Sequence, residues 1–434
     1  MLPLRHELEQ RWLLYQYSDE AVFDLYDTWW QSFYCGYDPT ADSFTIGHLV
    51  SIMNAVHYMR RGNTFYLMLG GATGMIGDPS GKNAERAFLS DETVRHNVDA
   101  IGRQMTSLLA NIEEMLGQKL HFEMANNADF YTDMSYLRFL RDVGKYITVN
   151  AMMHKETVKR RLTDPDQSIS YTEFSYMLLQ GYDFLRRYQD KWLKLQTCGS
   201  DQWGNCVTGL ELIDKIADGK AYVASTPLLL DASGKKFGKS EGNALRLDPT
   251  KNSPYTVYQY FMNTADADIE RYLKILTLLE FDTIEQIIAT HHSDPATRYG
   301  QEQLAWQVIR IIFGQDALRQ AQMISQILFS KENPLDMIAT MSVDDIQALQ
   351  EETGGEKNSQ FTMHNAQLPI IELLVQTWLA SSNGDAKKLI ESRGVSYQER
   401  VVEDIHATVS ASDAVNGVIL LRKGKKNFRV VLVG

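Results

Sequence analysis

Cysteine, long apolar runs and internal repeats are scarce or missing in this sequence. The 434 residues include only three cysteines, Cys35, Cys198 and Cys206, and none of them forms a CxxC pair. This spacing excludes a disulfide framework and a zinc knuckle, so we expect free thiols. No apolar run approaches the roughly 20 residues that span a bilayer, and the N-terminus "MLPLRHELEQRWLLYQ" mixes charges into its first turns instead of forming a signal segment. The sequence therefore predicts a soluble, cytoplasmic protein with no membrane partner.

Apolar segments of strand length alternate with segments of helical period in the first half of the chain. The segment "NTFYLMLGGATG" predicts a buried strand that runs into a glycine turn, and "SDETVRHNVDAIGRQMTSLLANIEEML" predicts a long helix capped by Ser90 or Asp91. Such alternation favours a parallel α/β sheet. After about Pro249 the apolar spacing becomes three and four, which predicts a helical domain. The polar stretch 350–367, interrupted by Gly354-Gly355, is the best linker candidate.

The net charge of −12 is unevenly distributed along the chain. Residues 384–434 carry nine Lys and Arg against six Asp and Glu, so a small basic segment follows an acidic body. Within this segment, "LLRKGKKNFRVVLV" predicts a basic β-hairpin with a glycine turn between two apolar runs. Such a charge cluster is typical of a solvated sheet edge that resists aggregation, and it also suits the phosphates of a nucleic acid.

Two glycine-bearing stretches are candidates for ligand binding. The first, "FYCGYDPTADSFTIGHLV" at 33–50, combines Asp-Pro, two glycines, hydroxyl residues and a lone His48 after an aromatic run. The second, "GGATGMIGDPSGK" at 70–82, does not fit a P-loop, because Ile76 stands where the first glycine belongs. It does not fit a dinucleotide fingerprint either, because the required acidic residue would fall inside the next helix. Its glycines allow a ligand to approach the backbone, and a tight turn without a ligand has the same composition.

Two further segments place polar side chains in a row. In "SISYTEFSYMLLQGYDFLRRY", Ser170 and Glu173 have the spacing of a capping box, so a helix should begin there. Tyr176, Gln180 and Asp183 then share one face, which is either the solvated side of the helix or a wall that binds a small zwitterion. In "ASGKKFGKSEGNA", three lysines crowd a glycine-rich loop. This loop is either a flexible solvated turn or a binding site for a polyphosphate.

Taken together, five motifs resemble the bacterial tyrosyl-tRNA synthetases, which are class I aminoacyl-tRNA synthetases. They are "YCGYDPTADSFTIGHL", "GGATGMIGDPSGK", "YTEFSYMLLQGYDF", "GSDQWGN" and "KKFGKSEGN", in the order and spacing of that family across nearly 210 residues. The resemblance covers almost the whole chain and is weakest from about 330 to 385. It implies an enzyme that activates L-tyrosine with ATP and then transfers it to the terminal adenosine of tRNA(Tyr).

The resemblance also implies a domain organisation. We expect an α/β fold with a Rossmann-like parallel-sheet catalytic domain at 1–230, followed by an α-helical domain and a small α+β, S4-like RNA-binding domain. Within the catalytic domain, the resemblance implies a dimer-forming insertion around 125–165, and hence a homodimer. The remaining predicted boundaries are a loop and connector at 231–250, an anticodon-binding helical domain at 251–335, a linker at 336–367 and the RNA-binding domain at 368–434.

The resemblance implies a role for each residue of this sequence that matches a site residue in the motifs of the family. Tyr34 and Asp183 should meet the phenolic hydroxyl of the substrate, while Asp78, Tyr176 and Gln180 should hold its ammonium group. The complete implied tyrosine site is Tyr34, Asp78, Tyr176, Gln180, Asp183 and Gln202. The implied ATP site is Cys35, Gly36, Asp38, Gly47, His48, Gly199, Asp201, Lys239 and Ser240. The implied catalytic groups, which would stabilise the leaving pyrophosphate together with Mg²⁺, are Thr40, Thr45, His48, Lys82, Arg86, Lys236 and Lys239. No protein-held metal is implied.

One position departs from the family pattern. Thr45 stands where the family has the first His of its H-I-G-H motif. Its hydroxyl could contact phosphate, or it could cap the following helix by accepting from the backbone N–H of His48. The departure keeps open a catalytically weakened relative that acts as an RNA-binding or regulatory protein. A tryptophanyl enzyme is the other alternative, although an indole has no hydroxyl for Tyr34 and Asp183 to bind.

Overall fold

The computed structural model describes residues 2–28, 30–80, 89–164, 168–232, 234, 237–240, 243–329, 333–353, 362–364, 367–424 and 427–434. Its contacts divide the chain into two units. The first unit comprises Met1–Asn252 and Tyr260–Gly314, and the second comprises Ser253–Gln259 and Gln315–Gly434. Among the described helices, none combines the length and the apolar character needed to cross a bilayer.

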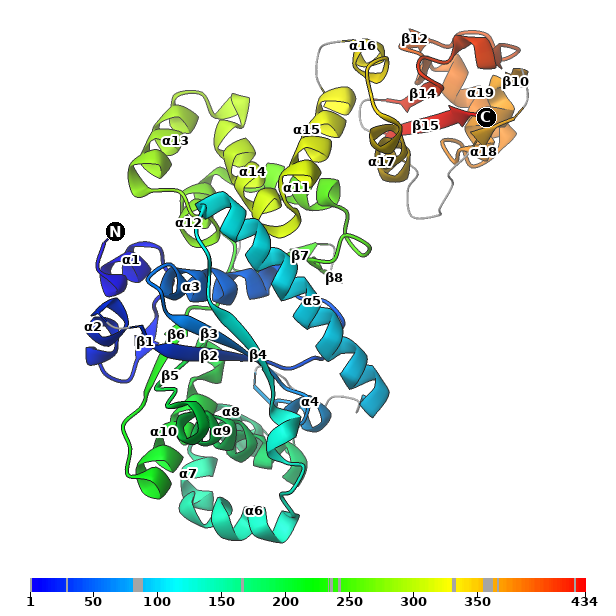
Figure 1. The fold of residues 1–434 in the computed structure, drawn as a ribbon. Helices are drawn as coiled ribbons and strands as arrows, with labels where there is room; N and C mark the ends of the chain where they lie inside the picture. Colours follow the sequence, from blue (N-terminus) through cyan, green and yellow to red (C-terminus); the bar gives the residue numbers. More distant parts are fainter. Residues whose placement is uncertain are drawn as a thin grey trace. The chain divides into compact units, whose positions relative to one another are not determined.

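A six-stranded sheet with the order β1-β6-β5-β2-β3-β4 forms the centre of the first unit (Figure 1). Its strands are β1 (Gln16–Tyr17), β2 (Ser32–Tyr37), β3 (Thr64–Leu69), β4 (Phe122–Asn126), β5 (Leu195–Gly199) and β6 (Tyr222–Thr226). All neighbouring pairs are parallel except β1 and β6. The predicted α/β class and parallel sheet are confirmed. A parallel sheet needs cover on both faces, which explains why every residue of β6 and all but the first residue of β3 are buried.

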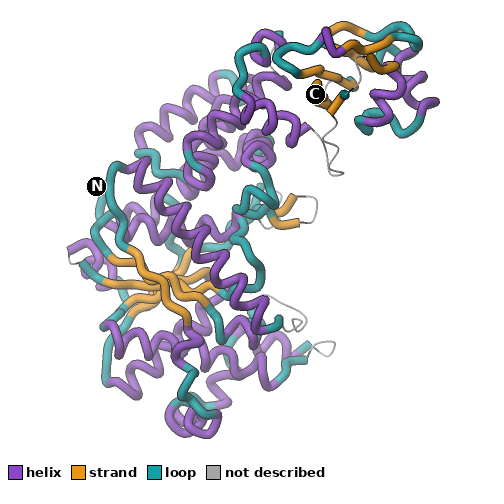
Figure 2. Tube along the Cα trace, turned by 45° about the vertical axis from the view of Figure 1, so that its right-hand side comes forward, coloured by secondary structure: helices purple, strands orange, loops and turns teal. Residues whose placement is uncertain are grey.

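Helices cover both faces of this sheet (Figures 1 and 2). Those of the first unit are α1 (Leu4–Gln10), α2 (Ala21–Thr28), α3 (Leu49–Met59), α4 (Thr73–Ile76), α5 (Asp91–Leu116), α6 (Tyr136–Asp142), α7 (Val149–Met153), α8 (Glu156–Thr163), α9 (Tyr171–Lys191), α10 (Trp203–Ala217), α12 (Asp266–Leu276), α13 (Phe281–Ser293) and α14 (Tyr299–Phe313). The two predicted caps are confirmed. The Ser90 side chain accepts a hydrogen bond from the backbone N–H of Thr93 at the start of α5. Ser170 and Glu173 form a capping box at the start of α9.

Alternation along β2 sends consecutive side chains to opposite faces of the sheet. The Tyr34 ring packs edge-on against Phe184 of α9, with ring centroids 5.4 Å apart. Phe33 instead contacts Tyr58 of α3, and Tyr37 contacts Phe44 just before that helix. One strand therefore supplies side chains both to the α9 side and to the α3 side of the sheet.

The second unit contains a five-stranded sheet with the order β12-β11-β14-β15-β9. Its strands are β9 (Thr362–Met363), β11 (Val395–Tyr397), β12 (Arg400–Val401), β14 (Val418–Lys423) and β15 (Asn427–Val433), and β10 (Gln367–Pro369) pairs separately with β13 (Thr408–Ser410). Its helices are α15 (Gln315–Phe329), α16 (Pro334–Ile338), α17 (Val343–Thr353), α18 (Ile370–Gln376) and α19 (Asn383–Glu391). The predicted basic hairpin is confirmed, since β14 and β15 pair antiparallel from Val418–Leu432 to Lys423–Asn427.

The contacts group the helical region differently from the predicted boundaries. Helices α12 to α14 belong to the first unit, whereas α15 to α17 belong to the second, and α11 (Pro254–Met262) spans the division. The stretch predicted as a linker contains α17, whose Ile346 and Leu349 join the apolar cluster under β14 and β15. Burial of these side chains on one sheet face explains why this stretch packs instead of remaining an extended connection.

Candidate active site

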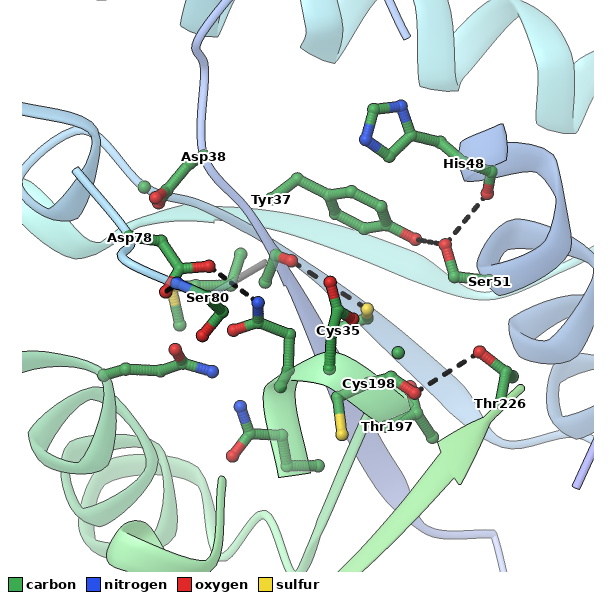
Figure 3. Close-up of a pocket in the computed structure, with 18 of the residues that line it drawn as sticks. Cys35, Tyr37, Asp38, His48, Ser51, Asp78, Ser80, Thr197, Cys198 and Thr226 are labelled. Atoms are coloured by element: carbon green, nitrogen blue, oxygen red, sulfur yellow. Dashed lines mark hydrogen bonds between the residues drawn. The ribbon is translucent and has the colours of Figure 1, made fainter. Parts of the chain in front are cut away.

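A cavity of about 390 Å³ lies at the carboxyl ends of β2, β3 and β5 in the first unit (Figure 3). Ligands of open parallel sheets bind at this edge, because the strand ends and the following loops diverge there. Every predicted site residue from 34 to 78 and from 176 to 202 lines the cavity. These residues are Tyr34, Cys35, Gly36, Asp38, Thr40, Thr45, Gly47, His48, Asp78, Tyr176, Gln180, Asp183, Gly199, Asp201 and Gln202.

The remaining predicted residues belong to two glycine-rich segments. Lys82, Arg86 and Lys236 lie outside the described residues. Lys239 and Ser240 form the short strand β7 (Lys239–Ser240), which pairs with β8 (Asn243–Ala244), and only their backbone is described. The predicted contacts of these five residues with phosphate therefore remain predictions.

At the inner end of the cavity, Tyr34 and Asp183 provide buried polar groups. The Tyr34 side chain is buried and its hydroxyl has no hydrogen-bond partner among the described residues. Asp183 is also buried. Its carboxylate accepts hydrogen bonds from Asn127 Nδ2 at 2.8 Å and from the Tyr131 hydroxyl at 3.2 Å. Burial raises the pKa of Asp183 to about 7, although these two donors act in the opposite direction. An unpaired hydroxyl beside an acceptor in an apolar environment suits a ligand that has its own hydroxyl.

The raised pKa of Asp183 predicts a pH-dependent stability difference. The folded state holds the proton more tightly than the unfolded state, so the stabilisation from this group is complete below about pH 4 and is lost as the pH rises through about 7. Asp183→Asn, which removes the buried charge, should therefore raise the free energy of unfolding by about 3–4 kcal/mol at pH 8 and by less than about 2 kcal/mol at pH 5. Denaturant unfolding of both proteins at pH 5, 6.5 and 8 tests this, and a difference that does not vary with pH would contradict it.

Asp78 and Gln180 add acceptor oxygens to the same cavity. Asp78 accepts from Gln202 Nε2 at 2.7 Å and from the backbone N–H of Ser80 at 3.0 Å. The Oε1 atom of Gln180 is buried without a hydrogen-bond partner among the described residues, while its Nε2 donates to Cys206 Sγ at 3.6 Å. Carboxylate and amide oxygens in such an arrangement suit an ammonium group. The Tyr176 hydroxyl lies beside them and donates to Asp38 Oδ2 at 2.8 Å.

On the α3 side, Thr45 and His48 contact each other at the start of a short helical turn, η1 (Ile46–His48). The backbone N–H of Thr45 donates to His48 Nδ1 at 2.9 Å, and Thr45 Oγ1 lies 3.1 Å from the same ring nitrogen. Because Nδ1 accepts from the backbone, the neutral ring carries its proton on Nε2. The backbone N–H of Thr45 thus fixes the tautomer and orients the imidazole. Thr45 and His48 together form a capping box, which includes the capping role considered from the sequence.

The segment that follows β6 returns to this helical turn. An isolated bridge joins Thr45 to Arg246, and Ile46 N donates to Leu245 O at 2.9 Å. Gly238 has φ +81°, and a Cβ added there would lie 2.0 Å from Cγ2 of Ile46. Glycine is therefore required at this position for both conformational and steric reasons. The close approach brings the backbone of Phe237 and Gly238 beside Ile46 and Gly47.

Sequence reasoning did not identify Asn127, Tyr131 or Gln196. Asn127 and Tyr131 follow β4 and donate to Asp183, while Gln196 of β5 lines the cavity with its Oε1 unpaired among the described residues. The segment "FEMANNADFY" offered one signal, a short apolar run followed by two asparagines. Its partner Asp183 lies 56 positions from Asn127, so no local pattern could reveal the contact.

Comparisons with known proteins bear on this site. The family model described as tRNA synthetases class I (W and Y) matches residues 31–330, and that of the tyrosine–tRNA ligase SYY-like C-terminal domain matches residues 351–431. The tyrosine–tRNA ligase of Streptococcus gordonii is 41% identical over 427 residues, covering 98% of both chains. The chain belongs to the tyrosine–tRNA ligase family. A Streptococcus pneumoniae member of the family is 40% identical over 429 residues, again covering 98% of both chains.

Solved structures agree with this family membership. A C-terminally truncated mitochondrial tyrosyl-tRNA synthetase of Aspergillus nidulans superposes with a TM-score of 0.69 and 29% identity, covering 76% of this chain and 95% of that chain. A Plasmodium falciparum tryptophanyl-tRNA synthetase superposes less well, with a TM-score of 0.50 and 14% identity, covering 79% of this chain and 87% of that chain. The likeness to the tryptophan enzyme shows the shared fold alone, so the alternative of a tryptophanyl enzyme is not supported.

Proposed function

We propose that this protein joins L-tyrosine to tRNA(Tyr) in two steps. A carboxylate oxygen of tyrosine bonds to the α-phosphorus of ATP as the bond to pyrophosphate breaks, which gives tyrosyl-adenylate. A ribose hydroxyl of the terminal adenosine of tRNA then attacks the carbonyl carbon, loses its proton, and AMP leaves. The observation that carries the proposal is that Tyr34 and Gln180 line the same cavity with two buried atoms, Tyr34 OH and Gln180 Oε1, that have no hydrogen-bond partner among the described residues.

In this proposal the chain's residues position and stabilise charge and provide no nucleophile. Asp183 accepts a hydrogen bond from the substrate hydroxyl, and the Tyr34 hydroxyl donates a hydrogen bond to that same substrate oxygen. Asp78 and Gln180 hold the ammonium group. The remaining predicted ATP contacts, including Cys35, Asp38 and Asp201, line the same cavity. His48, with its proton on Nε2, donates to the phosphates at the beginning of α3, where helix polarity also favours negative charge.

Mg²⁺ enters this proposal bound to the phosphates of ATP, as part of the substrate. The described residues contain no group of three or more His, Cys, Asp or Glu side chains that could hold a metal ion. We therefore assign no protein ligands to the ion and derive no step through it. The positively charged side chains that we propose to bind the leaving pyrophosphate are Lys82, Arg86, Lys236 and Lys239.

The reaction is tested by amino-acid-dependent exchange of pyrophosphate into ATP. The assay is run with tyrosine, with tryptophan and without an amino acid. Exchange with tyrosine alone supports the proposal, and exchange with tryptophan alone would replace it with the tryptophanyl alternative. The absence of exchange in every case would favour the catalytically weakened relative.

Replacement of Thr45 tests how the turn at 45–48 contributes to catalysis. Because Thr45 Oγ1 lies 3.1 Å from His48 Nδ1, Thr45→Ala should loosen the imidazole and slow adenylate formation several-fold, while ATP affinity changes less. Stopped-flow measurement of tyrosyl-adenylate formation tests this, with Thr45→Ser, which keeps the hydroxyl, as the matched control. If Thr45→Ala leaves the step unchanged and instead lowers stability by about 1 kcal/mol, capping is its main role.

We also propose a homodimer formed through the insertion around 125–165. Large apolar side chains are exposed there, including Tyr136, Leu137, Val149 and Met153, with Leu137 77% exposed. Exposed apolar surface of this kind is typical of an interface between subunits. Sedimentation should give about twice the mass of one chain at micromolar concentration. Leu137→Glu should shift the protein toward monomers, whereas Trp192→Glu, at an exposed position outside the insertion, should not.

The predicted anticodon-binding region, the RNA-binding C-terminal domain and a cytoplasmic location remain parts of this proposal. The basic hairpin β14–β15, with Arg422, Lys423 and Arg429, supports RNA binding by the second unit. Charging of tRNA should accordingly weaken as salt rises, because phosphate contacts release counterions.

A further inference from the structure

Trp378 occupies an unusual position directly after helix α18 in the second unit. α18 ends at Gln376, and Trp378 follows with φ +58°, a left-handed conformation in which glycine is favoured after a helix. The Trp378 side chain is nevertheless 56% exposed. Figure 1 shows α18 beside β14 and β15, the two strands of the basic hairpin. A large aromatic side chain is thus exposed on the segment that directly follows α18.

Two basic side chains of the hairpin hold the backbone on both sides of this tryptophan. Lys423 Nζ donates to the carbonyl oxygen of Leu379 at 2.9 Å, and Arg429 Nε donates to that of Thr377 at 2.9 Å. The strand register explains this arrangement, because Lys423 and Arg429 lie on the sheet face whose Leu421 and Val431 pack in the core with α18 and α19. The backbone on both sides of Trp378 is consequently held by positively charged side chains.

The left-handed conformation by itself does not distinguish Trp378. Trp12 and Trp192 also have positive φ values and are 55% and 73% exposed. Among the described residues, however, no Lys or Arg side chain donates to the carbonyls that flank Trp192. The paired cations are therefore the feature that distinguishes Trp378, and Trp192 offers a matched control.

The two cations differ in what they can still bind. The Arg429 guanidinium also donates to the carbonyls of Thr353 and Phe428, at 2.6 and 2.8 Å, so it mainly fixes the turn. The Lys423 ammonium has three N–H donors and one hydrogen-bond acceptor, Leu379 O, among the described residues. An exposed tryptophan whose neighbouring carbonyl is bound by such an ammonium matches a nucleotide, whose base stacks on the ring while its phosphate meets the charge.

We propose that Trp378 and Lys423 form a site for one unpaired nucleotide of the tRNA, with the base stacked on the indole and its phosphate bound by the ammonium. The nucleotide must be unpaired, because both faces of a base inside a helix are already covered. This inference rests on the proposed function, which supplies the RNA. It adds a specific contact to the second unit.

Binding of a tRNA(Tyr) transcript to the full chain tests the stacking contact. Trp378→Leu, which keeps apolar bulk without an aromatic face, should weaken binding about 10-fold, whereas Trp378→Phe should stay within about 3-fold. Trp192→Leu should bind like the wild type. Unchanged binding by Trp378→Leu would overturn the proposal, as would equal losses for Leu and Phe, which would indicate packing instead of stacking.

Two measurements keep the test decisive if Trp378→Leu disturbs folding. The wild type should show a component of tryptophan fluorescence that tRNA quenches and that Trp378→Phe lacks, and identical quenching of both would overturn the proposal. Lys423→Gln, which can still donate to Leu379 O, should reduce the slope of log Kd against log salt by about one. An unchanged slope would remove the phosphate contact.

Failure of this inference is distinguishable from failure of the proposed function. Titration of RNA requires no catalysis, whereas pyrophosphate exchange requires no RNA. A wild type without tyrosine-dependent exchange would contradict the function, and Trp378 variants that bind tRNA normally would contradict only the nucleotide site.

Discussion

Asp183→Ala is expected to remove most of the preference for tyrosine over phenylalanine. In the wild type, phenylalanine would leave the Tyr34 hydroxyl and the Asp183 carboxylate buried without the substrate's hydroxyl, at about 1–3 kcal/mol for each unpaired group. Enzymes of this family are a standard example of such discrimination. The alanine variant has lost one of the two groups, so the ratio of kcat/KM for the two substrates should fall by at least about 10- to 100-fold.

The selectivity measurement compares kcat/KM for tyrosine and phenylalanine in pyrophosphate exchange. Asn127→Ala is an informative second variant, because it removes a 2.8 Å hydrogen bond to Asp183 but leaves the carboxylate in place. We expect a smaller loss of selectivity from it than from Asp183→Ala. If Asp183→Ala leaves the ratio unchanged, the phenolic hydroxyl is recognised elsewhere.

A chain that ends after Gly314 is expected to retain tyrosine-dependent exchange and to lose tRNA charging by about 100-fold or more at physiological salt. All described residues that line the cavity lie between Tyr34 and Phe237, within the first unit. The removed segment carries the basic hairpin and Trp378.

The position of the cut determines the outcome of this experiment. A chain that ends after Gln367 would keep α15 to α17 but lose β14 and β15, which cover Ile324, Ile346 and Leu349. Exposure of that apolar cluster should cause aggregation. Exchange and charging measured on both truncations, with thermal unfolding as a control for folding, test the boundary. Equal loss of exchange and charging in the chain ending at Gly314 would mean that the second unit supports the fold of the first.

Several elements could be predicted because their causes are local. The capping box at Ser170 and Glu173 depends on residues three positions apart, and the basic hairpin depends on two apolar runs around a glycine turn. The motifs that line the cavity could also be recognised, because each is a short continuous segment: three lie at the ends of β2, β3 and β5, and one lies on helix α9.

Other features depend on segments that are distant in the sequence. The contact of Asn127 with Asp183 joins β4 to α9 across 56 positions, and the bridge from Thr45 to Arg246 crosses most of the first unit. The assignment of α17 to the second unit likewise depends on apolar contacts with β14 and β15.

The sequence alone therefore determined the fold class, the family resemblance and the identity of most residues around the cavity. Only the tertiary structure decided how those groups are paired: which buried atoms lack a partner, which donors act on Asp183, and how Thr45 orients His48. The physical reason is that hydrogen bonding and desolvation depend on the three-dimensional surroundings of a side chain, whereas periodicity and capping depend on its neighbours along the chain.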